Sequence, residues 1–381
     1  MKFAVLTDRH EPGRGGLERQ VDGWARWLAG RGHEVHLFVF HAPAPAPSTL
    51  TVHRIDPAGS ALDRARRLEA AARAIDGAFL HDFGAGIGGD LFMPLYGARW
   101  AGRDGQLRAR RPLRRLRLSL HPRWRRQQRE ASALEAAQLA GTSLIVACSG
   151  RVAADLRKAG ARCPIEILHN PVDPDHHRPP DKALRARRRA ERGWGEDATV
   201  FLQVAHDFHL KGVANSIRAL ARAARTGADL HLAIAGRGPD PVPFRALAQR
   251  LGIDDRVHFL GAMADTREAY EAADLLLHPA LYDACSLTLQ EGMACGLPVI
   301  ASMADGSAEL VTEGVQGWRV SDPRNLRMIA GAMRGMLEPG LRRAMGAQAR
   351  RLAEQNDIGS NFSRLEAICL AKAGRQVSVA G

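Results

Sequence analysis

The sequence predicts an α/β protein with two doubly wound, Rossmann-like domains that face a cleft, and two observations lead to this prediction. Short apolar runs alternate with segments of helical periodicity along the chain, which is typical of a parallel sheet covered by helices. The alternation falls into two series, and 381 residues suffice for two or three domains. Because ligands of such folds bind beyond the carboxyl ends of the strands, we expect the substrate between the two domains.

The first series starts at the N-terminus. Residues 2–8 form an apolar run typical of a strand, and apolar side chains recur at helical spacing over 17–28. Further strands are expected at 33–40 and 143–147. The N-terminal run is too short for the core of a signal peptide and is interrupted by charged residues, so we interpret it as the first strand of a cytoplasmic protein.

The second series starts after a stretch with four prolines and a run of arginines, which is typical of a linker. Its strands are expected at 199–205, 230–235, 257–260, 275–278 and 298–302. The predicted organisation is an N-terminal domain over 1–170, a linker over 171–197, a C-terminal domain over 198–360 and a segment over 361–381 that crosses back to the N-terminal domain.

The composition excludes several classes of protein. Hydrophobic residues make up 45% of the chain and charged residues 25%, which excludes a disordered chain. The five cysteines are odd in number and include no CxxC pair, which argues against a disulfide framework and a zinc ribbon. No apolar stretch reaches the roughly 18 residues of a membrane-spanning helix. No group of residues has the spacing of metal ligands, so we expect no metal and no other cofactor.

The excess of positive charge is local. Of the net charge of +13, the segment 103–129 contributes +10, from eleven arginines and one aspartate. Leucines and Trp124 interleave with these arginines, which suits an anionic membrane surface better than nucleic acid or a solvated face. We therefore expect a membrane-facing segment at about 98–129, a peripheral location on the inner face of the plasma membrane, and no nucleic-acid partner. The expected membrane contacts are Arg110, Arg111, Arg114, Arg115 and Trp124.

Two glycine-rich turns are candidate phosphate or sugar sites. Gly15 and Gly16 precede the first predicted helix, where adjacent glycines let backbone N–H groups approach a ligand; a flexible turn is the alternative. The run 84–89 matches GxGxxG literally, but no helical pattern follows it, so we reject a dinucleotide site there. His81 and Asp82 come where a strand should end, and they face either the cleft or a surface turn.

Two segments of the second series carry the strongest candidates. Lys211 lies between a predicted strand and a helix, which suits a diphosphate, although a solvated lysine fits this segment equally well. The stretch 274–300 reads as a buried strand, a loop with Asp283, a helix with Glu291 and a further strand. Carboxylates at these two positions can hold two sets of sugar hydroxyls, while a helix N-cap and a surface residue are the default interpretations.

With these motifs the sequence resembles the retaining glycosyltransferases of family 4, which have the GT-B architecture. Within the family it is similar to the transferases that glucosylate the heptose of the lipopolysaccharide core. The resemblance covers nearly the whole chain and rests most specifically on the stretch 273–300. Further matches lie at 15–19, 169–173 and 207–212.

The resemblance implies roles for individual residues of this chain. Glu291 would bind the ribose hydroxyls of a nucleotide, Asp283 would bind the hydroxyls of the donor sugar, and Lys211 would stabilise the leaving diphosphate. The other implied donor-side residues are Gly15, Gly16, His206, His209, Gly261, Met263, Ala284, Cys285, Ser286 and Leu287. The implied acceptor-side residues are Glu18, His81, Asp82 and Tyr96.

The implied reaction moves a hexose, glucose from UDP-glucose, onto a lipid-linked glycan such as the lipopolysaccharide inner core, with retention and without a metal. The alternatives are a family-4 transferase with a capsule, exopolysaccharide or other lipid-linked acceptor, and an inactive relative that acts as a binding protein. Three positions depart from the family pattern. Leu210 replaces an arginine, Asp283 replaces the longer glutamate, and the segment 93–97 stands where many relatives keep a histidine.

Overall fold

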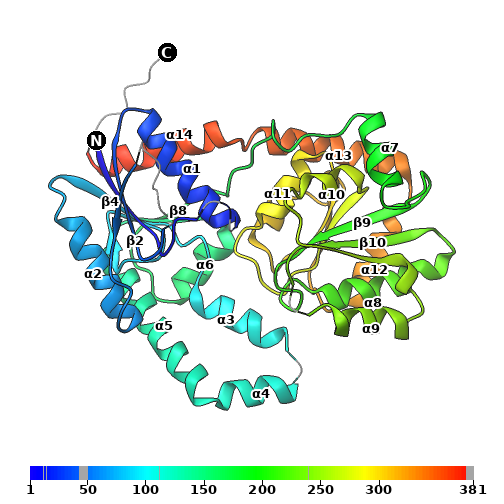
Figure 1. Ribbon diagram of the computed structural model, residues 1–381, viewed down its shortest axis with the longest axis horizontal. Helices are drawn as coiled ribbons and strands as arrows, with labels where there is room; N and C mark the ends of the chain where they lie inside the picture. The colour runs from blue at the N-terminus through cyan, green and yellow to red at the C-terminus, as the bar shows by residue number, and fades with distance from the viewer. Residues whose placement is uncertain (12, 14, 43–49, 111, 239, 375–381) are drawn as a thin grey trace. The chain divides into compact units, whose positions relative to one another are not determined.

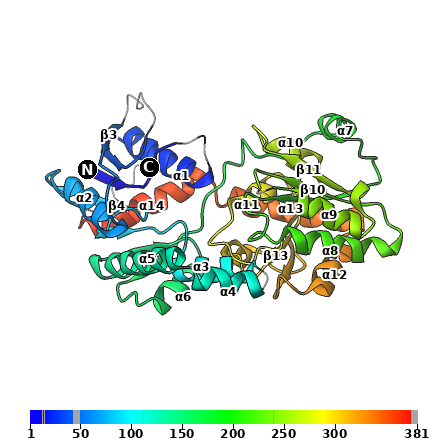
Figure 2. The same cartoon turned by 60° about the horizontal axis from the view of Figure 1, so that its bottom comes forward.

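The computed structural model describes residues 1–381 except 12, 14, 43–49, 111, 239 and 375–381, and the chain divides into two compact units. Unit 1 comprises 1–103, 112–169 and 359–381, and unit 2 comprises 104–111 and 170–358. Each unit contains a parallel sheet with helices packed on it (Figure 1 and Figure 2). The prediction of two doubly wound α/β domains is therefore confirmed.

In the described part of unit 1 the strands are ordered β3-β2-β1-β4-β6-β7-β8, and every pair is parallel. The order reverses between β1 and β4. The chain places β2 and β3 on one side of β1, and then β4 and the later strands on the other side. The strands are β1 (Lys2–Leu6), β2 (Glu34–Val39), β3 (Thr51–Arg54), β4 (Ala78–Asp82), β5 (Gly88–Gly89), β6 (Leu91–Phe92), β7 (Ile145–Ala147) and β8 (Ile165–Ile167).

The central strand β1 is apolar on both faces because helices cover both faces of the sheet. Phe3 meets the ring edge of Trp24 on one face, and Leu6 packs with Leu68 on the other. These two helical residues belong to α1 and α2. The helices are α1 (Gly16–Gly30), α2 (Ala61–Arg73), α3 (Arg99–Arg108), α4 (Pro112–Leu120), α5 (Pro122–Gly141) and α6 (Gly150–Lys158).

The C-terminal helix α14 (Ile358–Lys372) packs beside α1, although the two are far apart in sequence (Figure 1). The ring of Phe362 lies 5.5 Å from that of Trp24, edge to face. The buried Glu366 accepts a hydrogen bond from Trp27 Nε1 at 3.3 Å and lies 2.9 Å from His33 Nε2. Helix α14 thus completes the core of unit 1.

In the described part of unit 2 the strands are ordered β11-β10-β9-β12-β13-β14, again with parallel pairs, and the order reverses between β9 and β12. One face of this sheet packs against α8, α9 and α12, and the other against α10, α11 and α13. The strands are β9 (Thr199–Val204), β10 (Leu230–Ala235), β11 (Val257–Gly261), β12 (Leu275–His278), β13 (Val299–Ser302) and β14 (Gly317–Val320). The helices are α8 (Val213–Ala223), α9 (Val242–Arg250), α10 (Arg267–Ala272), α11 (Leu287–Ala294), α12 (Leu326–Gly335) and α13 (Pro339–Glu354).

The stretch that the sequence indicates as a linker contains a helix, α7 (Lys182–Ala190), which belongs to unit 2. Its buried Arg189 donates to Asp274 Oδ2 at 3.1 Å, and Arg185 donates to Asp274 Oδ1 at 2.8 Å. Asp274 stands just before β12, so these ion pairs attach the stretch to the sheet.

Candidate functional site

The candidate site of unit 2 lies at the carboxyl ends of β9 and β12, where the strand order reverses. Lys211 follows β9 and Asp283 follows β12. Loops leave such a pair of strands in opposite directions, which opens a crevice at the sheet edge and makes it the usual ligand site of this fold class. The topology therefore brings together two residues that the sequence singled out separately.

The loop before Lys211 is shaped by hydrogen bonds to Asp207. Its carboxylate Oδ1 accepts from the backbone N–H groups of His209 and Leu210, each at 3.0 Å, and its carbonyl accepts from Lys211 N at 2.8 Å. The carbonyl of Leu210 in turn accepts from Leu281 N at 2.8 Å, which joins this loop to the one that follows β12.

Gly212 allows the two loops to approach. It has φ +74°, and a Cβ atom placed on it would lie 2.2 Å from the carbonyl oxygen of Pro279. Both the left-handed backbone and the lack of space require glycine here. Gly212 also precedes the first residue of α8, so Lys211 is fixed between a tight turn and a helix start.

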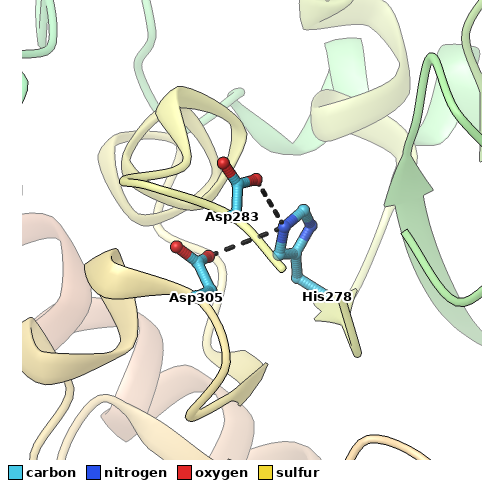
Figure 3. Close-up of side chains that lie close together, drawn as sticks. All are labelled: His278, Asp283 and Asp305. Carbon is cyan, nitrogen blue, oxygen red and sulfur yellow. Dashed lines mark hydrogen bonds and ion pairs between the residues drawn. The ribbon is translucent and has the colours of Figure 1, made fainter. Parts of the chain in front are cut away.

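Two basic side chains hold the carboxylate of Asp283. It pairs with Lys211 Nζ, and its Oδ2 lies 3.2 Å from His278 Nε2 (Figure 3). Burial alone would raise the pKa of Asp283, but the Lys211 ammonium and the His278 hydrogen bond outweigh burial and hold the pKa well below its usual range. Asp283 is therefore ionised at neutral pH.

Asp305, from the loop after β13, lies next to Asp283. The two loops pair as parallel backbone, with Asp283 N donating to Ala304 O and Gly306 N donating to Asp283 O, each at 3.1 Å. His278 Nε2 lies 3.5 Å from Asp305 Oδ2, so one imidazole nitrogen faces both carboxylates (Figure 3). Burial, followed by the charge of Asp283, raises the pKa of Asp305.

Sequence reasoning missed His278 and Asp305 as site residues. Asp305 is fully buried and accepts from Ser286 N at 3.2 Å, from Ser307 N at 2.9 Å and from Ser307 Oγ at 2.7 Å. It lies 22 residues beyond Asp283 on a different loop. No local spacing reveals such a partner, because only the pairing of β12 with β13 brings the two loops together.

The group His278, Asp283 and Asp305 has the geometry of a possible metal site, since its ligand atoms all lie within 4.8 Å of one another. The Lys211 ammonium already contacts Asp283 Oδ2, the oxygen that also faces His278. That ammonium supplies the positive charge that two adjacent carboxylates need. The expectation that no metal is required stays a prediction.

Glu291 lies on α11 and is almost fully buried. Its Oε2 accepts a hydrogen bond from the hydroxyl of the buried Tyr270 at 2.9 Å, and its Oε1 lies 3.9 Å from His177 Nε2. The carbonyl of His177 accepts from Arg350 Nη1 at 2.8 Å, which fixes this segment against α13. Glu291 is thus a positioned carboxylate and not the surface residue of the default interpretation.

The loop between Asp283 and α11 is buried and internally bonded. Ser286 caps α11 through its hydroxyl, which accepts from Leu289 N at 3.4 Å, while its own N–H donates to Asp305. The N–H of Ser286, one of the implied donor-side residues, is therefore used within the protein. Ala284 and Cys285 are buried, and Leu287, the first residue of α11, is partly buried.

The remaining donor-side candidates of unit 2 lie on two loops. His206 and His209 are exposed in the loop after β9, where the His209 ring lies 5.2 Å from that of Phe244. Gly261 ends β11 with φ +72°, and Met263 packs against the core beyond it. All four residues lie at or after the carboxyl end of a strand, as expected. Their positions alone do not show a contact with a donor.

In unit 1, Gly15 is the N-cap of α1 and Gly16 is its first residue, so both stand at a helix start as expected. Glu18 and Tyr96 line one hollow, together with Asp8 and Arg9. This hollow lies over the ends of β1 and β4, where the strand order of unit 1 reverses. The predicted acceptor residues Glu18 and Tyr96 are therefore brought together.

His81 and Asp82 lie elsewhere, because both side chains are 0% exposed. His81 Nδ1 accepts from Trp24 Nε1 at 3.1 Å, and burial lowers the pKa of His81 to about 3. Asp82 Oδ1 accepts from the N–H groups of residues 84, 85 and 86, and burial still raises the pKa of Asp82 to about 6. The pair is built into the core and the glycine-rich turn, which corrects our expectation that it faces an acceptor.

The basic segment forms α3, α4 and the start of α5. Arg114 and Arg115 are exposed, Arg110 and Trp124 are partly buried, and Arg111 lies outside the described residues. Three leucines of α4 are strongly exposed, at 78%, 56% and 61%: Leu113, Leu116 and Leu120. Their spacing places them on one side of the helix. Among the described residues no helix combines the length and apolarity that crossing a membrane requires.

Two family models match the chain. The model described as Glycosyltransferase Family 4 matches residues 14–176, and the model described as Glycosyl transferases group 1 matches residues 185–352. The matched ranges correspond to most of units 1 and 2.

Individual proteins give the same picture. The chain is 34% identical over 173 residues to the lipopolysaccharide glucosyltransferase WaaG of Escherichia coli K12, covering 45% of this chain and 46% of that protein. It is 35% identical over 189 residues to the D-inositol 3-phosphate glycosyltransferase of Acidothermus cellulolyticus, covering 47% and 41%. These matches span less than half the length of either relative. The crystal structure of WaaG, a glycosyltransferase involved in lipopolysaccharide biosynthesis, aligns with a TM-score of 0.76 at 26% identity over 97% of this chain and 99% of that one.

Proposed function

Because the chain belongs to the GT-B glycosyltransferases, with a family 4 domain followed by a group 1 domain, we propose that it moves a hexose from a nucleotide diphosphate sugar onto a lipid-linked glycan. The proposed donor is UDP-glucose, the proposed acceptor is the lipopolysaccharide inner core, and configuration is retained. One observation carries the proposal: Lys211 and Asp283 meet at the carboxyl edge of the unit 2 sheet, where the strand order reverses.

The paired charges of the site suit the two ends of such a donor. In this structure Lys211 and Asp283 neutralise each other. A bound diphosphate would attract the ammonium, and the hydroxyls of the sugar would donate to the carboxylate in its place. As the glycosidic bond breaks, negative charge develops on the diphosphate, and Lys211 together with the start of α8 stabilises it.

Glu291 would hold the ribose of the same donor. Along α11 the backbone rises about 1.5 Å per residue, so the five steps from the N-cap Ser286 to Glu291 correspond to roughly 7.5 Å. The Tyr270 hydrogen bond fixes one carboxylate oxygen before any ligand arrives. A carboxylate held in this way loses little side-chain entropy on binding two vicinal hydroxyls.

The missing arginine is the main chemical difference that the proposal must accommodate. Leu210 contributes no charge next to Lys211. His206 and His209 are exposed on the loop that carries Lys211. They are the basic residues nearest to Lys211 in the sequence. The proposed activity therefore depends more heavily on Lys211 than it would with an arginine beside it.

We also propose that α4 attaches the protein to an anionic membrane surface, where a lipid-linked acceptor would be found. The exposed Leu113, Leu116 and Leu120 can enter the headgroup region while Arg114 and Arg115 meet acidic lipids. This peripheral mode needs no helix that crosses the bilayer.

A second acceptor class stays open because a comparably similar relative is a D-inositol 3-phosphate glycosyltransferase. Capsule and exopolysaccharide glycans are further alternatives. An inactive relative that only binds a glycan would neither transfer the sugar nor hydrolyse the donor.

The experiment that tests the proposal is a transfer assay with radiolabelled UDP-glucose and lipopolysaccharides truncated at successive core residues. We expect label to enter the acceptor that ends at the inner-core heptose. Transfer to another glycan would support glycosyltransferase activity but rule out the inner core as the acceptor. If no common nucleotide sugar is transferred or hydrolysed, the proposed glycosyltransferase activity is wrong.

A further inference from the structure

We propose that Arg99 and Tyr96 form an acceptor subsite in unit 1 that selects a sugar carrying an acidic group, either a phosphate or a carboxylate. The acceptor role rests on the proposed function, and the chemical class of the acceptor is the new element. The subsite is a hollow distinct from the buried His81 and Asp82, which cannot contact a glycan in this structure.

The hollow lies at the carboxyl edge of the unit 1 sheet. Its wall includes Phe83 and Gly84, which follow β4, and Tyr96 and Gly97, which follow β6. The neighbouring hollow with Glu18 shares Phe83 and Tyr96, so the two lie side by side over the strand ends. Parallel sheets of this class bind their ligands at this edge.

Arg99 is the unusual member of the wall. Its Nη2 donates to the carbonyl of Gly84 at 3.0 Å, and no carboxylate of the described residues lies within 4.0 Å of its guanidinium nitrogens. Burial lowers the pKa of Arg99, while the more distant Glu135 and Asp82 act in the opposite direction. Arg99 is partly buried, and an arginine on a hollow without a carboxylate within 4.0 Å favours an external anion.

The other charged residues nearby are already engaged. Glu135 also lines this hollow: its Oε1 accepts from Arg99 N at 2.5 Å at the start of α3, and it attracts the guanidinium only from beyond 4.0 Å. In the neighbouring hollow Arg9 is paired with Glu11 at 3.0 Å. Of the two described arginines that line these hollows, Arg99 is the one with no carboxylate within 4.0 Å of its guanidinium nitrogens.

Tyr96 supplies the surface for the ring of the sugar. Its side chain is 62% exposed and borders both hollows. An aromatic ring of this kind can pack against the C–H face of a pyranose. Tyr96 and Arg99 together would bind a sugar ring that carries an acidic substituent. Glu18, in the adjoining hollow, is placed to accept hydrogen bonds from the sugar hydroxyls.

Titration calorimetry on the full chain tests the inference, with saturating UDP present to occupy unit 2. The probes are glucose 6-phosphate, glucuronate and glucose, which separate phosphate from carboxylate and both from a neutral ring. We expect at least one acidic sugar to bind about tenfold or more tightly than glucose, because charge-assisted hydrogen bonds of arginine contribute on that scale. Arg99→Gln should remove this preference, and Tyr96→Ala should weaken every sugar.

The matched control is Arg26→Gln, an arginine on α1 whose side chain is 48% exposed and paired with Asp22. It should bind all three sugars as the unaltered protein does. Equal binding of acidic and neutral sugars, unchanged binding by Arg99→Gln, or no sugar binding at all would overturn the inference. The three sugars are also compared on the unaltered protein, so the test remains decisive even if a variant fails to fold. Failure of the proposed function would appear separately, as absence of UDP binding.

Discussion

The Asp283 carboxylate accepts from two different side chains, Lys211 and His278. Because the aspartate side chain is short, both contacts are important for its position. Lys211 belongs to the loop that the donor diphosphate would approach, whereas His278 is buried at the end of β12. If a donor were to draw Lys211 away, as the proposed function requires, His278 would remain placed to hold the carboxylate. Asp305 faces the same imidazole nitrogen as Asp283 and is itself fixed by backbone and hydroxyl donors, so it limits where the imidazole can lie.

The hydrogen bond from Tyr270 to Glu291 gives a test at the level of one atom. Tyr270→Phe removes the hydroxyl but keeps the buried ring, so Glu291 loses its positioning donor. A hydrogen bond to a charged group contributes about 1.5–3 kcal/mol, and we expect the KM for UDP-glucose to rise about tenfold. The kcat should change little, since the ribose is remote from the breaking bond. A fall in kcat with an unchanged KM would contradict the ribose assignment.

Asp82 predicts a pH dependence of stability. Its pKa is raised from 3.8 to about 6, so the folded protein binds a proton more tightly than the unfolded chain. This contribution is complete below pH 4 and is lost as pH rises through 6, with an upper size on the order of 3 kcal/mol. Asp82→Asn cannot ionise and should flatten the decline of the unfolding free energy between pH 4 and 7. Urea unfolding at several pH values measures it, and an unchanged slope would refute the assignment.

At the scale of elements, the turn at Gly212 ties the loop after β9 to the loop after β12. Gly212→Ala adds a Cβ that would lie 2.2 Å from Pro279 O, and we expect both a lower melting temperature and a loss of donor binding. Gly193→Ala is the matched control, because Gly193 also has positive φ, at +68°, but has open space around its Cβ position. It should cost only about 1 kcal/mol of stability and spare donor binding. Equal effects of the two variants would show that close approach is unimportant.

Helix α4 gives a second test of an element. Changing Leu113, Leu116 and Leu120 to serine should lower binding to vesicles that contain acidic lipid by at least tenfold, since each exposed leucine can bury apolar area. Val242→Ser is the control, because Val242 is 62% exposed on α9 of unit 2. Cosedimentation with vesicles measures both. Binding that survives the triple change would leave only the arginines as a membrane contact.

For the whole molecule, the regular parts of the fold could be predicted from the sequence. Buried parallel strands are continuous apolar runs, so β9, β10 and β12 appear directly as such runs. Short strands such as β6 and β8 carry too few residues for a pattern. The helix in the predicted linker was hidden by its arginines, which pair with acidic residues far away in sequence.

The same limit applies to the candidate site. Lys211, Asp283 and Glu291 stand on loops and helices whose local sequence marks them, and the structure shows all three held by specific partners. His278 and Asp305 could not be found, because their contact depends on two loops meeting. His81 and Asp82 were placed on a surface because a strand end predicts the position of a residue but not the direction of its side chain.

The proposed function requires above all that Lys211 and Asp283 together bind a nucleotide sugar. Calorimetric titration of UDP-glucose into the full chain, into Lys211→Met and into Asp283→Asn tests it directly. We predict that the unaltered protein binds, that Lys211→Met loses affinity for both UDP and UDP-glucose, and that Asp283→Asn loses affinity for UDP-glucose while still binding UDP. Binding of UDP-glucose by both variants with the affinity of the unaltered protein would contradict the account.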